Sequence, residues 1–135
     1  KKGKLTEAEF VIMKRHTEIG AKMLQDSHIP ALDMAADIAL CHHEKWDGTG
    51  YPRELAGEDI PITARITTIV DIYDALVHER VYKKAMSEQD ALKLMRSMAG
   101  SHLDPTLFAV FEELLPVMRR IRKEVQEIDD LIVSV

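Results

Sequence analysis

The chain has 135 residues, enough to bury one sizeable core, and a formal net charge of −5 at pH 7. This acidic balance argues against nucleic-acid binding, which usually depends on a basic surface, so DNA is excluded as the expected partner. A single cysteine, Cys41, excludes an internal disulfide and fits a reducing cytoplasm, and no apolar run approaches the roughly 18–20 residues that span a bilayer.

Two helices are expected in the N-terminal third of the chain. Thr6 and Glu9 have the spacing of a capping box, which begins a helix that runs to about Gln25. Pro30 precedes a second helix, which we predict from about residue 31 to residue 44. Aliphatic residues and methionine dominate the apolar set, and this composition favours helices over a β-sandwich or barrel.

A third helix is expected over residues 62–78, after a turn-rich stretch from Trp46 to Pro61. Its predicted core face consists of Ile62, Ile66, Ile69, Val70, Tyr73 and Val77. A polar stripe beside this face consists of Thr67, Asp71, Asp74 and His78. The stripe can provide a metal ligand and a supporting carboxylate. A solvated surface is the alternative for Asp74 and His78, and for His78 it is the preferred interpretation.

Two further helix starts are predicted in the C-terminal third. Ser87 caps a fourth helix that ends near Gly100. Asp104 and Pro105 pair an N-cap with a proline at the first helical position and so begin a fifth helix. Beyond Pro116 we expect another, charge-rich amphipathic helix. The chain is therefore predicted to be an all-α domain, a bundle of about five to six helices.

The strongest chemical signal is the adjacent pair His42 and His43. On a helix their side chains point about 100° apart, so they suit two neighbouring metal ions or opposite sides of one cluster. His16 and Asp71 can supply ligands from other helices, and this mixture of imidazole and carboxylate suits Fe, Mn, Zn or Ni better than Ca or Mg. A lone histidine such as His16 is more often a hydrogen-bonded core residue, and that interpretation stays open.

These residues belong to an ordered series of motifs, which consists of His16, His42-His43, Gly50-Tyr51-Pro52, Asp71-Ile72-Tyr73-Asp74-Ala75-Leu76 and Arg80-Val81-Tyr82-Lys83. In order and spacing the series resembles the HD-GYP domains, over about residues 3–105. That family is helical, binds two or three metal ions and hydrolyses cyclic di-GMP and, in some members, cyclic GMP-AMP. The resemblance thus implies a bacterial, cytoplasmic, metal-dependent phosphodiesterase that gives linear dinucleotide or GMP in second-messenger signalling.

The resemblance also implies a role for each motif residue. The metal ligands it implies are His16, His42, His43 and Asp71, with Fe or Mn as the expected ions. The catalytic carboxylates it implies are Asp71 and Asp74. The substrate contacts it implies are Gly50, Tyr51 and Pro52 in the loop, and Arg80 and Lys83 at the phosphates. A rigid turn for the loop and a surface cation pair for Arg80 and Lys83 remain the structural alternatives.

The chain departs from the family pattern at its start. The His-Asp pair that names the family lies before residue 1, so we interpret residues 1–135 as the C-terminal portion of an HD-GYP domain. With part of the metal site missing, we expect weak or absent metal binding and little activity from this chain alone. The uncovered apolar surface makes a homodimer possible, and the family implies a regulatory domain upstream. The alternative function is a non-catalytic signalling module that binds a nucleotide or a protein partner.

Overall fold

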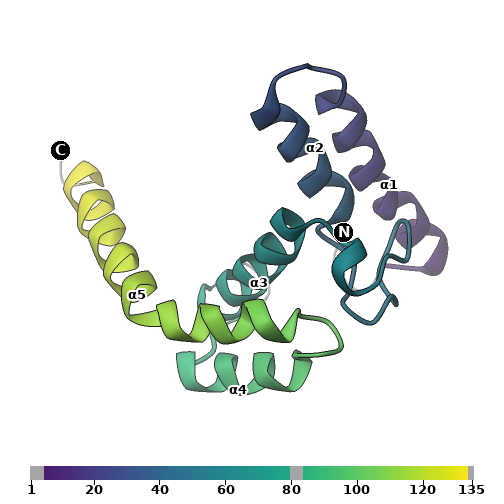
Figure 1. The fold of residues 1–135 in the computed structure, drawn as a ribbon. Coiled ribbons are helices and arrows are strands. Elements are labelled where there is room, and N and C mark those ends of the chain that lie inside the picture. The colour runs from purple at the N-terminus through teal and green to yellow at the C-terminus, as the bar shows by residue number, and fades with distance from the viewer. Residues whose placement is uncertain (1–4, 80–83, 134–135) are drawn as a thin grey trace.

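The computed structural model describes residues 5–79 and 84–133, and within these ranges the chain forms five α-helices and no β-strand. The elements are α1 (Glu7–Leu24), α2 (Pro30–Cys41), the short 3-10 helix η1 (Gly57–Asp59), α3 (Ile62–Val77), α4 (Glu88–Met98) and α5 (Pro105–Val133). Helices α1 and α2 form a hairpin at one end, and α3 connects it to α4 and α5 at the other (Figure 1). The predicted all-α class is confirmed.

The three predicted N-caps are present. The Thr6 hydroxyl accepts from the Glu9 backbone N–H, while the Glu9 carboxylate accepts from the Thr6 N–H at 2.8 Å, which completes the capping box of α1. The Ser87 hydroxyl accepts from the N–H of Asp90 at the start of α4. Asp104 caps α5 through its carboxylate. Each cap satisfies backbone donors that a helix start otherwise leaves unpaired, so these starts are encoded locally.

Helix α2 ends at Cys41, three residues before the predicted end. His42 is its C-cap, and His43 lies in the turn that follows. The cause is the next loop, which packs against the backbone of Glu44 and takes the place that another helical turn would need. The expected 100° separation of His42 and His43 therefore does not apply, because the two residues do not share a regular helix.

The predicted core face of α3 is only half correct. Ile69, like Tyr73 and Val77, is buried, whereas Ile62, Ile66 and Val70 are 54%, 46% and 38% exposed. Helices α4 and α5 cover one side of the apolar stripe, and the other side lines an open groove of about 280 Å³ between α3 and α5. The apolar stripe of α3 is thus wider than the part of it that α4 and α5 cover.

The predicted break at Pro116 is also wrong, because α5 is one helix with Pro116 inside it. Figure 1 shows α5 bending partway along its length, and its C-terminal half extends away from α3 and α4. Proline lacks the N–H for one helical hydrogen bond and its ring crowds the carbonyl four residues earlier, so a bend is the expected consequence. No helix among the described residues is both long and apolar enough to span a bilayer.

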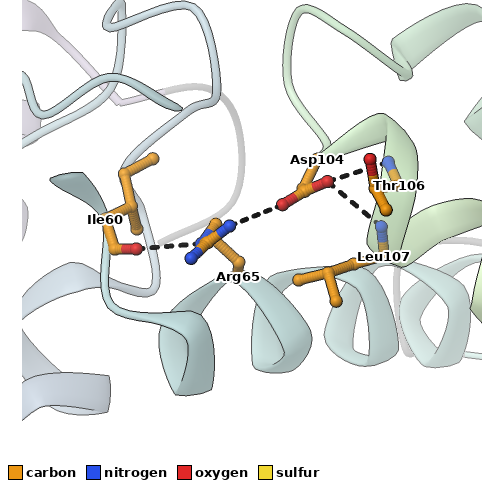
Figure 2. Close-up of polar contacts among 5 residues, drawn as sticks. All are labelled: Ile60, Arg65, Asp104, Thr106 and Leu107. Atoms are coloured by element: carbon orange, nitrogen blue, oxygen red, sulfur yellow. Dashed lines mark hydrogen bonds and ion pairs between the residues drawn. The ribbon is translucent and has the colours of Figure 1, made fainter. Parts of the chain in front are cut away.

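A largely buried ion pair connects α3 to the start of α5. Arg65 of α3 donates to the Ile60 carbonyl at 2.9 Å and binds the Asp104 carboxylate at 2.7 Å (Figure 2). The other oxygen of Asp104 accepts from the N–H groups of Thr106 and Leu107 at 2.8 and 3.1 Å. Because one carboxylate both caps α5 and holds Arg65, the loop before α3 is fixed relative to the start of α5.

Candidate metal centre

Three histidine side chains converge where α1 meets the end of α2. His16 comes from the middle of α1, and His42 and His43 from the end of α2 and the turn after it. One ring nitrogen from each of the three lies within 4.8 Å of the others, and His16 Nε2 is 3.3 Å from His42 Nε2. Among the described residues, this is the one group of three or more such side chains with metal-ligand spacing.

Backbone carbonyls fix the orientation of two of these rings. His16 Nδ1 lies 2.6 Å from the Met13 carbonyl, and His42 Nδ1 lies 3.0 Å from the carbonyls of both Ile38 and Ala39. A carbonyl can only accept, so Nδ1 carries the proton in both rings. In the neutral rings the two facing Nε2 atoms then hold lone pairs.

Two lone pairs at this distance repel unless a cation, either a proton or a metal ion, lies between or beside them. Histidine ligands in metal sites typically donate the other ring N–H to a carbonyl or carboxylate, as both rings do here. The donor set and its supporting hydrogen bonds therefore fit a transition-metal ion.

His43 is held by stacking. Its ring lies 4.8 Å from that of Tyr51 with 27° between the planes, and the Tyr51 N–H donates to the His43 carbonyl at 3.2 Å. Burial, together with His42 and His16, lowers the pKa of His43 to about 4, and Asp71 acts in the opposite direction. His43 is therefore a neutral imidazole near pH 7, the form that binds a metal ion.

The Gly50-Tyr51-Pro52 loop is built onto the same segment. A Cβ atom on Gly50 would lie 2.4 Å from the Lys45 nitrogen and 2.5 Å from the Glu44 Cα, so only glycine fits this close approach. The Glu44 carboxylate is buried and accepts from the N–H groups of Arg53 and Leu55 at 2.7 and 3.1 Å. Tyr51 packs against the His43 imidazole.

The carboxylates of α3 lie to one side of the three histidines. The Thr68 hydroxyl donates to the His42 carbonyl at 2.9 Å, which fixes α3 against the end of α2. Asp71 is one turn further along; it is exposed and does not belong to the converging group, but it is close enough to affect the pKa of His43. Asp71 and Asp74 line an open pocket of about 430 Å³, and Asp74 also binds His78 at 2.7 Å.

The structure thus brings three of the four predicted ligands together and leaves Asp71 at the edge. Arg80 and Lys83, the predicted phosphate contacts, lie outside the described residues. The sequence analysis missed Thr68, and it gave no role to Glu44, which adjoins the histidine pair. Thr68 lies on the helical turn before Asp71 and Glu44 directly follows His43, so proximity to the motifs was the available signal.

Comparison with known proteins gives one consistent family. The HD domain family matches residues 1–107. A cyclic di-GMP phosphodiesterase of Vibrio cholerae is 47% identical over 116 residues, which are 82% of this chain and 24% of that protein. A cyclic di-GMP phosphodiesterase of Thermotoga maritima is 41% identical over 128 residues, 92% of this chain and 35% of that protein.

Two relatives are named for a different substrate. A 3'3'-cGAMP-specific phosphodiesterase of V. cholerae is 42% identical over 113 residues, 84% of this chain and 22% of that protein. The crystal structure of a cyclic GMP-AMP-specific phosphodiesterase from V. cholerae aligns with a TM-score of 0.58 and 27% identity, over 76% of this chain and 22% of that one. The chain spans about a quarter to a third of the length of these relatives.

Proposed function

This chain belongs to the HD domain family, and from that premise we propose that it forms part of a metal-dependent phosphodiesterase in bacterial second-messenger signalling. The proposed substrate is a cyclic dinucleotide, cyclic di-GMP or 3'3'-cGAMP, the compounds named for its relatives. The proposed reaction adds water across a phosphodiester and gives linear dinucleotide, or GMP after a second cleavage. The observation that carries the proposal is the convergence of three imidazoles, two with facing Nε2 atoms.

His16, His42 and His43 are the residues proposed to hold metal, with Asp71 as a further ligand from α3. Fe or Mn is the proposed metal. When bound, such an ion supplies a Lewis acid for the phosphodiester and lowers the pKa of water toward neutrality. The influence of Asp71 on the pKa of His43 supports its place beside the three imidazoles.

The residues around the ligands have positioning roles in this proposal. The Met13 and Ile38 carbonyls set the tautomers of two rings, so that Nε2 is available on each. Tyr51 covers one face of the third ring and limits the access of water to it. The Thr68 hydroxyl, through the His42 carbonyl, keeps α3 and its carboxylates in place. A site prepared in this way loses little entropy when it binds an ion.

The substrate is proposed to lie over the carboxylate face of α3, next to the loop. The open pocket lined by Asp71 and Asp74 has the volume for part of a dinucleotide, and Asp74 is the second proposed catalytic carboxylate. Gly50, Tyr51 and Pro52 would border the substrate because their loop packs beside the His43 ring. Arg80 and Lys83 are proposed as phosphate contacts, and for these two residues the proposal rests on the motif alone.

The test combines metal analysis with an assay on the full-length protein purified without exposure to air. We expect bound Fe or Mn, and conversion of cyclic di-GMP or 3'3'-cGAMP to linear products by chromatography. His42→Ala should lose both metal and activity, while the matched control His28→Ala, in the exposed connection between α1 and α2, should keep both. Metal-loaded protein that leaves both cyclic dinucleotides intact would show that the enzymatic proposal is wrong.

A further inference from the structure

A lysine of α1 lies in an aromatic corner beside the three histidines. The ammonium of the half-buried Lys14 is 4.9 Å from the centroid of the Phe10 ring and 5.0 Å from that of the Tyr51 ring. The two rings stand at 78° to each other with their centroids 6.0 Å apart, so they form two walls around the ammonium. Aromatic faces attract a cation, and the long side chain of Lys14 is therefore held at one place.

Tyr51 connects this corner to the candidate metal centre. The same ring stacks on the His43 imidazole at 4.8 Å. The backbone of Lys14 is fixed as well, because the hydroxyl of the fully buried Thr17 donates to the Lys14 carbonyl at 2.9 Å. His16 lies between these two residues on α1. The ammonium thus has a defined position one aromatic ring away from a candidate metal ligand.

The charge of Lys14 is not neutralised within the part of the chain that the structure describes. None of the ion pairs found there includes Lys14. The acidic residue one turn further along α1 is Glu18, which lines a separate polar pocket together with Lys22 and Arg53. A cation that precedes an acidic residue by four positions is also the weaker order on a helix. The ammonium is therefore available to an acceptor from outside the chain.

The position of this cation suits a substrate with two negative charges. For metal binding alone a nearby cation is unfavourable, because like charges repel. A cyclic dinucleotide carries two phosphodiester groups, and only one of them can react at the metal in a single cleavage. The other lies across the macrocycle and keeps its negative charge. A fixed ammonium beside the metal centre can bind this second phosphate through a charge-assisted hydrogen bond.

We propose that Lys14 binds the non-reacting phosphate of the cyclic dinucleotide and makes the site selective for substrates with two phosphates. The inference rests on the proposed function, whose substrate class it deepens. Phe10 is a positioning residue that holds the ammonium in the corner. Lys14 acts from α1, whereas Arg80 and Lys83, the phosphate contacts proposed from the motif, follow α3 in the sequence.

The first experiment compares the steady-state kinetics and the metal content of the full-length protein and its variants. Lys14→Met removes the charge and keeps a long, unbranched side chain. With cyclic di-GMP or 3'3'-cGAMP as substrate, KM should rise about 10-fold while kcat changes little, because the lost contact is to a group that does not react. Bound metal should not decrease. Lys14→Arg keeps a cation that binds phosphate and should restore most of the affinity.

The matched control is Lys22→Met, which makes the same change of charge on the same helix, about 12 Å further along its axis. Its KM should equal that of the wild type. If Lys14→Met behaves as this control does, the inference is wrong and the proposed function stands. If Lys14→Met loses metal and kcat together, Lys14 only supports the metal centre, and the inference is also wrong. A full-length protein that hydrolyses no cyclic dinucleotide overturns both proposals.

Phe10→Leu tests the aromatic corner. Leucine fills part of the space but cannot attract the ammonium, so KM should rise about twofold to fivefold, less than in Lys14→Met. The control Val11→Ala, at an exposed apolar position next to Phe10, should keep the wild-type KM. A wild-type KM in Phe10→Leu would contradict the positioning role of this ring.

Competition identifies the part of the substrate that Lys14 contacts. The linear dinucleotide GpG has both bases and one phosphodiester, and its 5'-phosphorylated form, pGpG, adds a second phosphate. Both are measured as inhibitors of cyclic dinucleotide hydrolysis by the full-length protein. Lys14→Met should weaken inhibition by pGpG about 10-fold and leave inhibition by GpG unchanged. Equal weakening of both inhibitors would place the contact on a base or on the reacting phosphate and would overturn the inference.

Discussion

The histidine end of the molecule, formed by α1, α2 and the loop after them, depends on polar contacts, whereas the α3–α5 end depends on an apolar core. At the histidine end the buried apolar cluster is small, with Cys41 and Ile60 packed against Ala64 at the start of α3. At the α3–α5 end a larger cluster includes Ile69, Tyr73, Leu76, Leu92, Met95, Leu103, Phe108 and Phe111. The comparison indicates that stability resides mainly at one end and chemistry at the other, so substitutions at the two ends should have separable effects.

The largest effect is expected from the core of the α3–α5 end. Met95 is fully buried, so Met95→Ala removes packing and leaves a cavity that costs about 2–5 kcal/mol of unfolding free energy. Urea denaturation measures this loss, and Met23→Ala, on the surface of α1, is the control and should change little. In the full-length protein, metal bound per folded molecule should stay the same. A loss of metal binding in folded Met95→Ala would show that the two ends are not separable.

A smaller loss of stability is expected at the histidine end from Gly50→Ala. The added Cβ would meet the backbone of Glu44 and Lys45, which cannot yield as a flexible side chain would. Overpacking of this kind costs about 1–3 kcal/mol, and here it should also displace Tyr51 from the His43 ring.

The matched control is Gly57→Asn. Gly57 has a φ of 58°, which asparagine tolerates, and no atom near the position of a Cβ. Denaturation and metal titration of the full-length protein should show that Gly50→Ala lowers both stability and metal affinity, while Gly57→Asn preserves both. Wild-type metal affinity in Gly50→Ala would contradict the role given to the loop.

Tyr51→Leu should separate metal affinity from stability. Leucine still fills space in the loop but cannot stack on the His43 imidazole, so the ring loses its orientation. Changes next to metal ligands typically weaken binding about 10-fold to 100-fold, and we expect the lower end of this range. Titration of the full-length protein with Mn²⁺ or Zn²⁺ checks the change, and Tyr51→Phe, which keeps the stacked ring, should bind as the wild type does. If Tyr51→Leu bound metal as tightly as the wild type, the stack of Tyr51 on His43 would have no role in metal binding.

The smallest expected effect concerns His102, between the two ends. Burial, followed by the charge of Lys45, lowers the pKa of His102 below its ordinary value of 6.5, while Asp47 acts in the opposite direction. The unfolded chain therefore takes up a proton near pH 6.5 that the folded chain resists. This contribution to stability is complete above pH 6.5 and declines as the pH falls from 6.5 toward the folded pKa.

Urea denaturation across this pH range measures the contribution. As the pH falls from 7 to below 6.5, His102→Asn should lose less unfolding free energy than the wild type does. The control His28→Asn, at an exposed position, should show the same dependence of unfolding free energy on pH as the wild type. A His102→Asn curve parallel to that of the wild type would contradict the assignment.

Local sequence signals predicted much of the fold and the candidate site. The caps at Thr6, Ser87 and Asp104 depend on residues two or three positions away, so they can be read directly. The motif series likewise gave the family and the three histidines that the structure brings together. The end of α2 could not be predicted, because it depends on the contact of Gly50 with Glu44, a packing event between segments.

The sequence by itself determined the helical class, the helix starts and the residue types available for metal and phosphate chemistry. Only the tertiary structure decided that Ile66 and Val70 face an open groove, that α5 continues through Pro116, and that the Nε2 atoms of His16 and His42 face each other. The physical reason is the range of the interactions. Helix caps and periodicity arise within a few residues, whereas burial and ring orientation depend on contacts between segments far apart in the chain.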